Sequence, residues 1–318
     1  MKKLLLIMVF ATFVAINYQT TSNNLIKQIT LTMPTIKTEF PETINVQPDA
    51  SQCEEQTDIA AKEAMNNMQK RSLYLNLAAD YFDLDKPKAT TAEYAFFRHY
   101  IANSTGPILE PMCGTGRYLI PYVEEGFNIE GFDISPFMLK ALHTECAEKN
   151  ITPHVWEQFL EDIPTTKKYD LIFLPDSSFS LFLKPEHITI CLQKIYDLLQ
   201  KGGTFIFDVE TIYAVPEYIG IWQGKSYKKP DGTVMLCSIL PLPIENSIAT
   251  YIYRYELIDR TDIIKTEIEY FQIKLYYPTE MDAFLKEIGF SQIKRIGAYD
   301  HASSPAAHDY TIVYECIK

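Results

Sequence analysis

Basic residues are scarce in this sequence. Lys and Arg number 29 against 41 Asp and Glu, so the formal net charge is -12. Nucleic-acid binding rests chiefly on Lys and Arg that neutralise phosphates. The tightest basic cluster, residues 225–229, is short and adjoins a Pro-Asp-Gly turn signal. The composition therefore predicts no nucleic acid among the partners.

Metal-ligand and disulfide spacings are also missing. The six cysteines are scattered and include no C-x-x-C pair, the spacing found in many zinc and redox sites. We interpret them as small buried hydrophobes and predict no metal site. They are Cys53, Cys113, Cys146, Cys191, Cys237 and Cys316.

A hydrophobic run long enough for a comfortable membrane span is absent as well, since such a span needs about 20 apolar residues. Two lysines precede an apolar run at residues 4–16, and a polar stretch follows, as in a secretory signal peptide. We expect residues 1–22 to be a signal peptide or anchor, and membrane association through this segment only. A start of translation downstream, at Met33 or Met65, is the other open interpretation.

Residues 23–57 carry no sustained periodicity and are rich in Thr, Pro, Gln and Asn, which predicts a linker or disordered stem. One folded domain is expected over residues 58–318. It begins with a helical pattern at 58–81, and after Pro107 short apolar runs alternate with helical periods. Strands are expected at 108–109, 128–133, 154–158, 169–174 and 204–209, with helices ending near Gly126 and at 136–149 and 185–200.

This alternation predicts an α/β fold with a doubly wound, mostly parallel Rossmann-like sheet. Ligands of such sheets bind at the carboxyl ends of the strands. Stretches rich in Ile, Tyr and Thr then predict an antiparallel β insertion at about 215–277, before a helix at 278–288 and two last strands. The insertion strands are expected at 235–239, 247–257 and 265–277, and the last two at 292–299 and 310–317.

A glycine turn follows the first expected strand. Gly114 and Gly116 let backbone approach a ligand closely, and the N–H groups of the helix that follows point at it. Asp133 ends the second strand at about the 20-residue spacing that suits a ribose diol. With Glu110, it brings two carboxylates to one nucleoside-sized cleft. Leu119 replaces the third glycine of G-x-G-x-x-G, so a pyrophosphate cradle is not expected.

Five segments in this order resemble the motifs of class I S-adenosylmethionine-dependent methyltransferases of the small-molecule type. Residues 110–116 resemble motif I, an acidic residue followed by x-G-x-G-x-G, and residues 131–139 resemble G-x-D-x-S-x-x-M-L. Residues 79–83 are similar to the A-x-x-Y-D box, with Phe82 at its tyrosine and Tyr81 one place earlier. The fourth- and fifth-strand signatures match at 169–173 and 199–207. The likeness covers about residues 71–318.

The resemblance implies S-adenosylmethionine as cofactor. It places Glu110, Gly114 and Gly116 at the methionine end, and Asp133 at both ribose hydroxyls. Arg117 either meets the methionine carboxylate or faces solvent. The remaining residues implied to bind the cofactor are Cys113, Ile134, Met138, Leu160 and Pro175, of which Ile134 and Met138 pack against the adenine.

The sequence departs from the family pattern at two further positions. Met112 stands at the usual first glycine, where a side chain crowds the backbone. Phe159 stands where an acidic residue commonly reads the adenine amino group, so the backbone of Leu160 or the side chain of Gln158 is expected to take over. The loop at 176–179 lines the methyl-transfer site in related enzymes.

The resemblance implies methyl transfer to a small-molecule acceptor. Tyr81 is the candidate catalytic residue, and its other interpretation is a packing aromatic. Further candidates for proton transfer are His99, Glu210, His301 and His308. The tyrosine-rich insertion resembles a substrate cover, and its composition favours a partly apolar or cationic acceptor.

Two other functions stay open. The chain is alternatively a non-catalytic S-adenosylmethionine-binding protein or, against the missing third glycine, a nucleotide-dependent oxidoreductase. The N-terminal segment suggests export or anchoring, whereas the cofactor is made in the cytoplasm, so localisation is open. The sequence leaves the oligomeric state open too.

Overall fold

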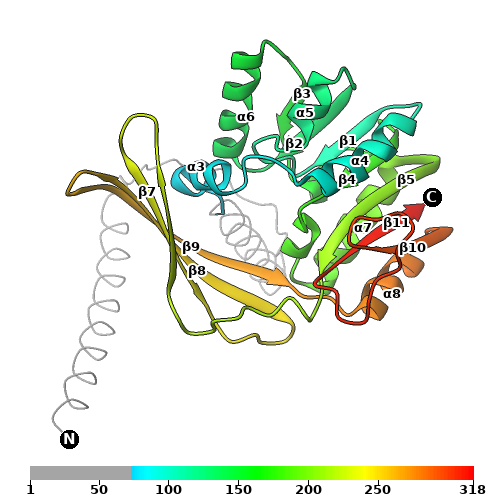
Figure 1. The fold of residues 1–318 in the computed structure, drawn as a ribbon. Coiled ribbons are helices and arrows are strands. Elements are labelled where there is room, and N and C mark those ends of the chain that lie inside the picture. The colour runs from blue at the N-terminus through cyan, green and yellow to red at the C-terminus, as the bar shows by residue number, and fades with distance from the viewer. Residues whose placement is uncertain (1–72) are drawn as a thin grey trace, which may run out of the picture. The chain divides into compact units, whose positions relative to one another are not determined.

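A mostly parallel sheet of seven strands lies at the centre of the fold, in the order β10-β11-β5-β4-β1-β2-β3 (Figure 1). Strands β1 to β5 pair in parallel, and β11 lies antiparallel between β5 and β10. The predicted α/β class is therefore confirmed. The strands are β1 Ile108–Pro111, β2 Ile129–Asp133, β3 His154–Glu157, β4 Tyr169–Leu174, β5 Leu199–Glu210, β10 Gln292–Gly297 and β11 Thr311–Ile317.

The computed structural model describes residues 73–318, which belong to the compact unit Ile59–Lys318. The expected signal or anchor at 1–22, the stem at 23–57 and the start of the helix predicted from residue 58 lie outside the described residues. Within the described part, no helix combines the length and the apolar character that a membrane crossing requires.

Helices cover both faces of the large sheet. On one face α4, α5 and α6 bury side chains such as Phe97, Leu119 and Leu142, and on the other face α7 and α8 bury Leu192 and Leu285. The strand order reverses at β1, between β4 and β2, which is the switch point where ligands of such sheets bind. The helices are α4 Thr91–Asn103, α5 Leu119–Glu124, α6 Pro136–Lys149, α7 Pro185–Leu198 and α8 Pro278–Ile288.

Local sequence signals account for the helix ends. The side chains of Thr90 and Glu93 form a capping box at the start of α4, and Ser135 Oγ accepts a hydrogen bond from the Met138 N–H at the start of α6. Gly289 closes α8 in the left-handed conformation. These signals explain why the bounds predicted for α6 and α8 agree with the structure.

A second sheet of four antiparallel strands forms from the predicted insertion, in the order β6-β7-β8-β9. Figure 1 shows it in yellow and orange, apart from the large sheet, with α3 (Asn76–Asp85) beside it. One of its faces packs on α3 through a small apolar cluster that includes Leu77, Met235 and Tyr255. The strands are β6 Gln223–Lys228, β7 Val234–Pro241, β8 Ile248–Asp259 and β9 Asp262–Lys274.

The bounds of several elements differ from the sequence-based prediction, most clearly at β6, at β5 and at the first described helix. Strand β6 was missed, because its polar and basic residues carry no apolar alternation. Strand β5 begins at Leu199 rather than at residue 204, because Leu199 pairs with Tyr169 before a bulge in the register. The first described helix begins at Asn76, so the helix predicted for 58–81 is wrong at residues 73–75.

Candidate functional site

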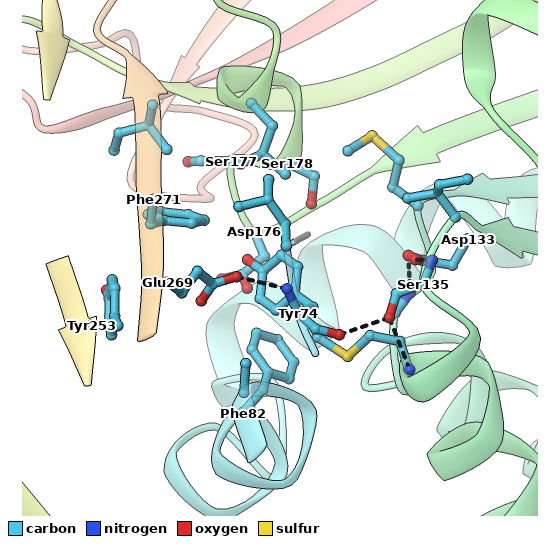
Figure 2. Close-up of a pocket in the computed structure, with 18 of the residues that line it drawn as sticks. Tyr74, Phe82, Asp133, Ser135, Asp176, Ser177, Ser178, Tyr253, Glu269 and Phe271 are labelled. Atoms are coloured by element: carbon cyan, nitrogen blue, oxygen red, sulfur yellow. Dashed lines mark hydrogen bonds between the residues drawn. The ribbon is translucent and has the colours of Figure 1, made fainter. Parts of the chain in front are cut away.

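A cavity of about 400 Å³ lies between the carboxyl ends of the parallel strands and one face of the second sheet. Figure 2 shows Asp133 and Ser135 on one side of it, Tyr253, Glu269 and Phe271 on the other, and Tyr74 between them. Six of the predicted site residues line this cavity, namely Tyr81, Gly114, Asp133, Ile134, Met138 and Leu160.

The turn after β1 brings backbone to the cavity wall. Met112, Gly114 and Gly116 all have positive φ, of 54°, 54° and 88°. A Cβ on Gly114 would have no atom within 4 Å, so this residue presents bare backbone to open space. Met112 adopts the left-handed conformation without the freedom of glycine, which is a strained arrangement. Met112 therefore keeps a backbone conformation that favours glycine, and the departure from the usual glycine lies in its side chain.

Asp133 is fixed at the end of β2 by two backbone donors. Its Oδ2 accepts a hydrogen bond from the Gly114 N–H at 2.9 Å and its Oδ1 accepts one from the Ser135 N–H at 2.8 Å. Burial raises the pKa of this carboxyl, and the backbone hydrogen bonds oppose that rise. A carboxylate offers about four acceptor positions, so Asp133 retains capacity for ligand hydroxyls.

An apolar wall continues from Asp133 along α6 and the residues after β3. Ile134, Met138 and Leu160 line the cavity together with Gln158 and Phe159. The Gln158 N–H donates to the Asp133 carbonyl oxygen at 3.0 Å, which ties the two segments together. A flat ring could therefore lie between aliphatic side chains close to the Asp133 carboxylate.

The other predicted cofactor residues lie behind the cavity wall. Cys113, Gly116 and Pro175 are buried and do not line the cavity. A Cβ on Gly116 would come within 2.8 Å of the Ile120 side chain, so this glycine serves close packing. Glu110 is only 2% exposed, and its Oε2 has no hydrogen-bond partner among residues 73–318. Burial, and then the charge of Asp133, raises the pKa of Glu110 well above its usual value.

Arg117 supports the loop after β4 instead of facing solvent. Its Nη1 lies 2.9 Å from Asp176 Oδ1, and its Nη2 lies 3.4 Å from Glu93 Oε2. Lys86 approaches the same Asp176 at 3.1 Å. Asp176 and Ser177 follow β4 with φ of 61° and 54°, so two cations hold a loop whose backbone is strained.

Comparison with known proteins agrees with this geometry. Residues 108–203 match a family described as a methyltransferase domain. The S-adenosylmethionine-dependent methyltransferase from Clostridium acetobutylicum has the same fold, with a TM-score of 0.62 and 17% identity over 75% of this chain and 96% of that chain. Residues 108–203 form a methyltransferase domain.

Two further proteins are similar to parts of the chain. A protein of Geobacillus sp. (strain WCH70), named as a methyltransferase, is 25% identical over 142 residues, which make up 44% of this chain and 56% of that protein. The aligned region therefore spans little more than half of that relative. The sugar N-methyltransferase KedS8 from Streptoalloteichus has a TM-score of 0.60 at 17% identity, over 74% of this chain and 91% of that chain.

Tyr81 belongs to α3, and its side chain packs against the second sheet. Its ring contacts Tyr227 and Tyr255 at centroid distances of 5.9 and 5.5 Å, and it belongs to the apolar cluster there. Burial, and then the neighbouring Cys237, raises the pKa of Tyr81. These surroundings favour the packing interpretation, since a phenol with a raised pKa is a poor base near neutrality.

Two carboxylates at the end of β5, Asp208 and Glu210, have pKa values closer to neutrality than Tyr81 has. Glu210 lines the cavity, and burial raises its pKa to about 7, with Lys86 lowering and Asp176 raising it. Asp208 is fully buried and accepts hydrogen bonds from Ser177 N, Ser177 Oγ and Tyr299 Oη at 2.8, 2.9 and 3.1 Å. The histidines named as further candidates, His99, His301 and His308, do not line the cavity.

The second sheet, which the sequence predicted only as a tyrosine-rich cover, supplies individual cavity residues that were not named. Tyr251, Tyr253 and Tyr255 lie at alternate positions of β8 and line the cavity, as do Glu269 and Phe271 of β9. Alternation along a strand places such residues on one face, so the spacing of the three tyrosines was the available signal. Tyr74 was also missed. Its N–H donates to Glu269 Oε1 at 2.6 Å, and its carbonyl oxygen accepts from Ser135 Oγ at 2.8 Å (Figure 2).

Proposed function

We propose that the protein transfers a methyl group from S-adenosylmethionine to a small-molecule acceptor. The observation that carries the proposal is the pairing of Asp133 with Gly114 at the cavity wall. A buried carboxylate is held beside bare backbone, and an apolar wall of Ile134 and Met138 adjoins it. This combination suits a ribose with an attached base.

The residues present fit such a cofactor. Asp133 would hold the ribose hydroxyls, Ile134 and Met138 would pack on the adenine, and Gly114 would leave room for the methionine part. Glu110 lies behind this wall and does not reach the cavity, so it would act on the cofactor only through the turn. When bound, the sulfonium supplies a methyl group, as the acceptor's lone pair bonds to carbon and the electrons of the broken carbon–sulfur bond stay on sulfur.

The shape of the cavity supports a small acceptor. About 400 Å³ lies at the lower end of the range of ligand pockets, and the second sheet walls it opposite the cofactor residues. A protein whose fold is similar is named as a sugar N-methyltransferase. Alignment of acceptor and methyl group can supply much of the rate acceleration, so a rigid wall of rings would contribute by positioning the acceptor.

Titration calorimetry with S-adenosylmethionine and S-adenosylhomocysteine tests the proposal. We expect saturable binding of both, with no binding of NAD, because the turn has no pyrophosphate cradle. A folded sample that gives no heat with millimolar S-adenosylmethionine would rule the proposal out. Binding without turnover on any class of acceptor would instead favour the non-catalytic alternative, for which the strained Met112 is the structural argument.

A further inference from the structure

We propose that the acceptor is an amine, which binds as an ammonium ion against the aromatic face of the second sheet and gives a proton to Glu210. The inference rests on the proposed methyl transfer and assigns its substrate class and its base. Its structural basis is one cavity that joins an aromatic wall, an excess of negative charge and an unpaired carboxylate.

The aromatic wall is formed by Tyr251, Tyr253 and Phe271. The centroid of the Phe271 ring lies 6.3 Å from that of Tyr251 and 5.7 Å from that of Tyr253, and the latter pair meets edge to face at 87°. Tyr251 and Phe271 are direct cross-strand partners. Ring faces attract an ammonium ion within about 6 Å of their centroids, so this wall suits a cationic group.

The charges around the wall favour the same ligand. The carboxylates of Asp176, Glu210 and Glu269 line the cavity, and Lys86 is the single Lys or Arg side chain among the described residues that does so. Lys86 is already paired with Asp176 at 3.1 Å. A carboxylate or phenolate acceptor would meet net negative charge, whereas an ammonium ion would be attracted.

Glu210 is the carboxylate that is free to receive a proton. Within residues 73–318, no hydrogen bond or ion pair reaches its side chain. Glu269, in contrast, accepts hydrogen bonds from the Tyr74 N–H and the Tyr255 hydroxyl. The other lining carboxylates, which are Asp85, Asp133, Glu161 and Asp176, also have partners.

The environment of Glu210 suits a base at neutral pH. Burial raises its pKa to about 7, against the opposing charge of Lys86 and with support from Asp176. Tyr251 of β8 lines the same cavity, and burial, followed by the charge of Glu210, raises the pKa of that tyrosine. A base whose pKa lies near the working pH serves best in general base catalysis.

The proton balance is simple. An ammonium group has no lone pair, so it cannot accept a methyl group until it loses one proton. The Glu210 carboxylate takes that proton and becomes a neutral carboxylic acid, and the amine nitrogen gains the lone pair that forms the new bond. The proton leaves Glu210 for solvent after the product departs, which restores the carboxylate.

Three probes of matched shape test the inference by binding alone. Benzylamine, benzyl alcohol and benzoate are titrated by calorimetry at pH 8 into protein saturated with S-adenosylhomocysteine. We expect benzylamine to bind at least about tenfold more tightly than the other two, because a paired charge in a partly desolvated site adds affinity. Glu210→Gln should reduce this preference to about twofold or less.

The control is Glu245→Gln, which removes the same charge from an exposed position between β7 and β8 and should leave the preference intact. Melting temperatures verify that both variants fold. The wild-type protein gives a second measure that needs no variant. Its preference for benzylamine should fall at pH 6, where Glu210 is largely protonated and the probe is still an ammonium ion.

The outcomes separate the two proposals. Equal affinity for the three probes, or tighter binding of benzoate, with S-adenosylhomocysteine bound would overturn the amine inference alone. If the preference for benzylamine persists both in Glu210→Gln and at pH 6, then Glu210 is not the group that receives the proton. Failure to bind S-adenosylhomocysteine would overturn the proposed function, and this inference with it.

Discussion

In the large sheet, the residues that reach the cavity lie at or just after the ends of strands, whereas in the second sheet they lie along the strands. Gly114 and Asp133 belong to the first group, and their positions depend on turns with defined backbone angles. Tyr251, Tyr253 and Phe271 belong to the second group and depend on the alternation of side chains across a strand.

The difference predicts how each region tolerates change. A turn that presents bare backbone should lose ligand affinity when its backbone angles change, because it would contact the ligand through backbone atoms. A face of side chains can change ring by ring while the strands stay paired. Substitutions at the strand ends of the large sheet should therefore lower cofactor affinity, and substitutions on the face of the second sheet should lower acceptor affinity.

The largest expected effect concerns Asp133→Ala. Two hydrogen bonds to a charged acceptor are worth about 1.5 kcal/mol each, so S-adenosylmethionine affinity should fall by about 100-fold. Titration calorimetry measures the change. Tyr253→Leu in the second sheet is the matched comparison and should leave cofactor affinity within about twofold while it weakens benzylamine. Unchanged affinity in folded Asp133→Ala would place the ribose elsewhere.

An effect of similar size, on stability instead of affinity, is expected from one of two glycine substitutions. Gly116→Ala places a Cβ 2.8 Å from Ile120 in a left-handed backbone, which should cost about 3 kcal/mol and lower Tm by roughly 6–12 °C. Gly224→Ala in β6 meets only the Cys237 carbonyl oxygen, at 3.6 Å, and should shift stability by no more than about 0.5 kcal/mol. Thermal unfolding measures both, and similar losses would remove the contrast between the sheets.

The smallest effect is a pH dependence of stability that arises at the rim of the large sheet. Burial, and then Asp176, raises the pKa of Asp208 to about 7 from an unfolded value near 3.8. Between these values the folded state binds more protons than the unfolded state, so the free energy of unfolding falls as pH rises, by at most about 1.4 kcal/mol per pH unit. Asp208→Asn should flatten this slope in denaturant unfolding at pH 5 and pH 7. A slope that is unchanged in the variant would assign it to other groups.

The sequence predicted the large sheet well for a physical reason. Glycine turns, helix caps and buried apolar strands are local signals, so the turn at 113–116, helix α6 and strand β4 could be located from neighbours in the chain alone. Five of the predicted cofactor residues line the cavity. Glu110 was placed at the right strand end, but its burial beneath the turn depends on packing that no local pattern encodes.

The second sheet could be predicted only in outline. The composition of the insertion indicated antiparallel strands, yet the pairing of Tyr251 with Phe271 depends on register across a hairpin. Strand β6 has polar and exposed residues and is recognisable by its partner β7 alone. The loop at 176–177 is held by Arg117 and Lys86 from distant segments, so its role could not be derived from its own residues.

The backbone of Tyr74 has a consequence for the rate of ligand exchange. Its N–H and carbonyl oxygen bond to Glu269 of β9 and to Ser135 beside α6, and the Leu77 N–H bonds to Glu267 in the same way. Tyr74 also lines the cavity, so this hydrogen-bonded segment forms part of the wall around a bound molecule. If a molecule leaves past this segment, several hydrogen bonds must open together, and both its association and its dissociation are then slow relative to a cavity with an open wall.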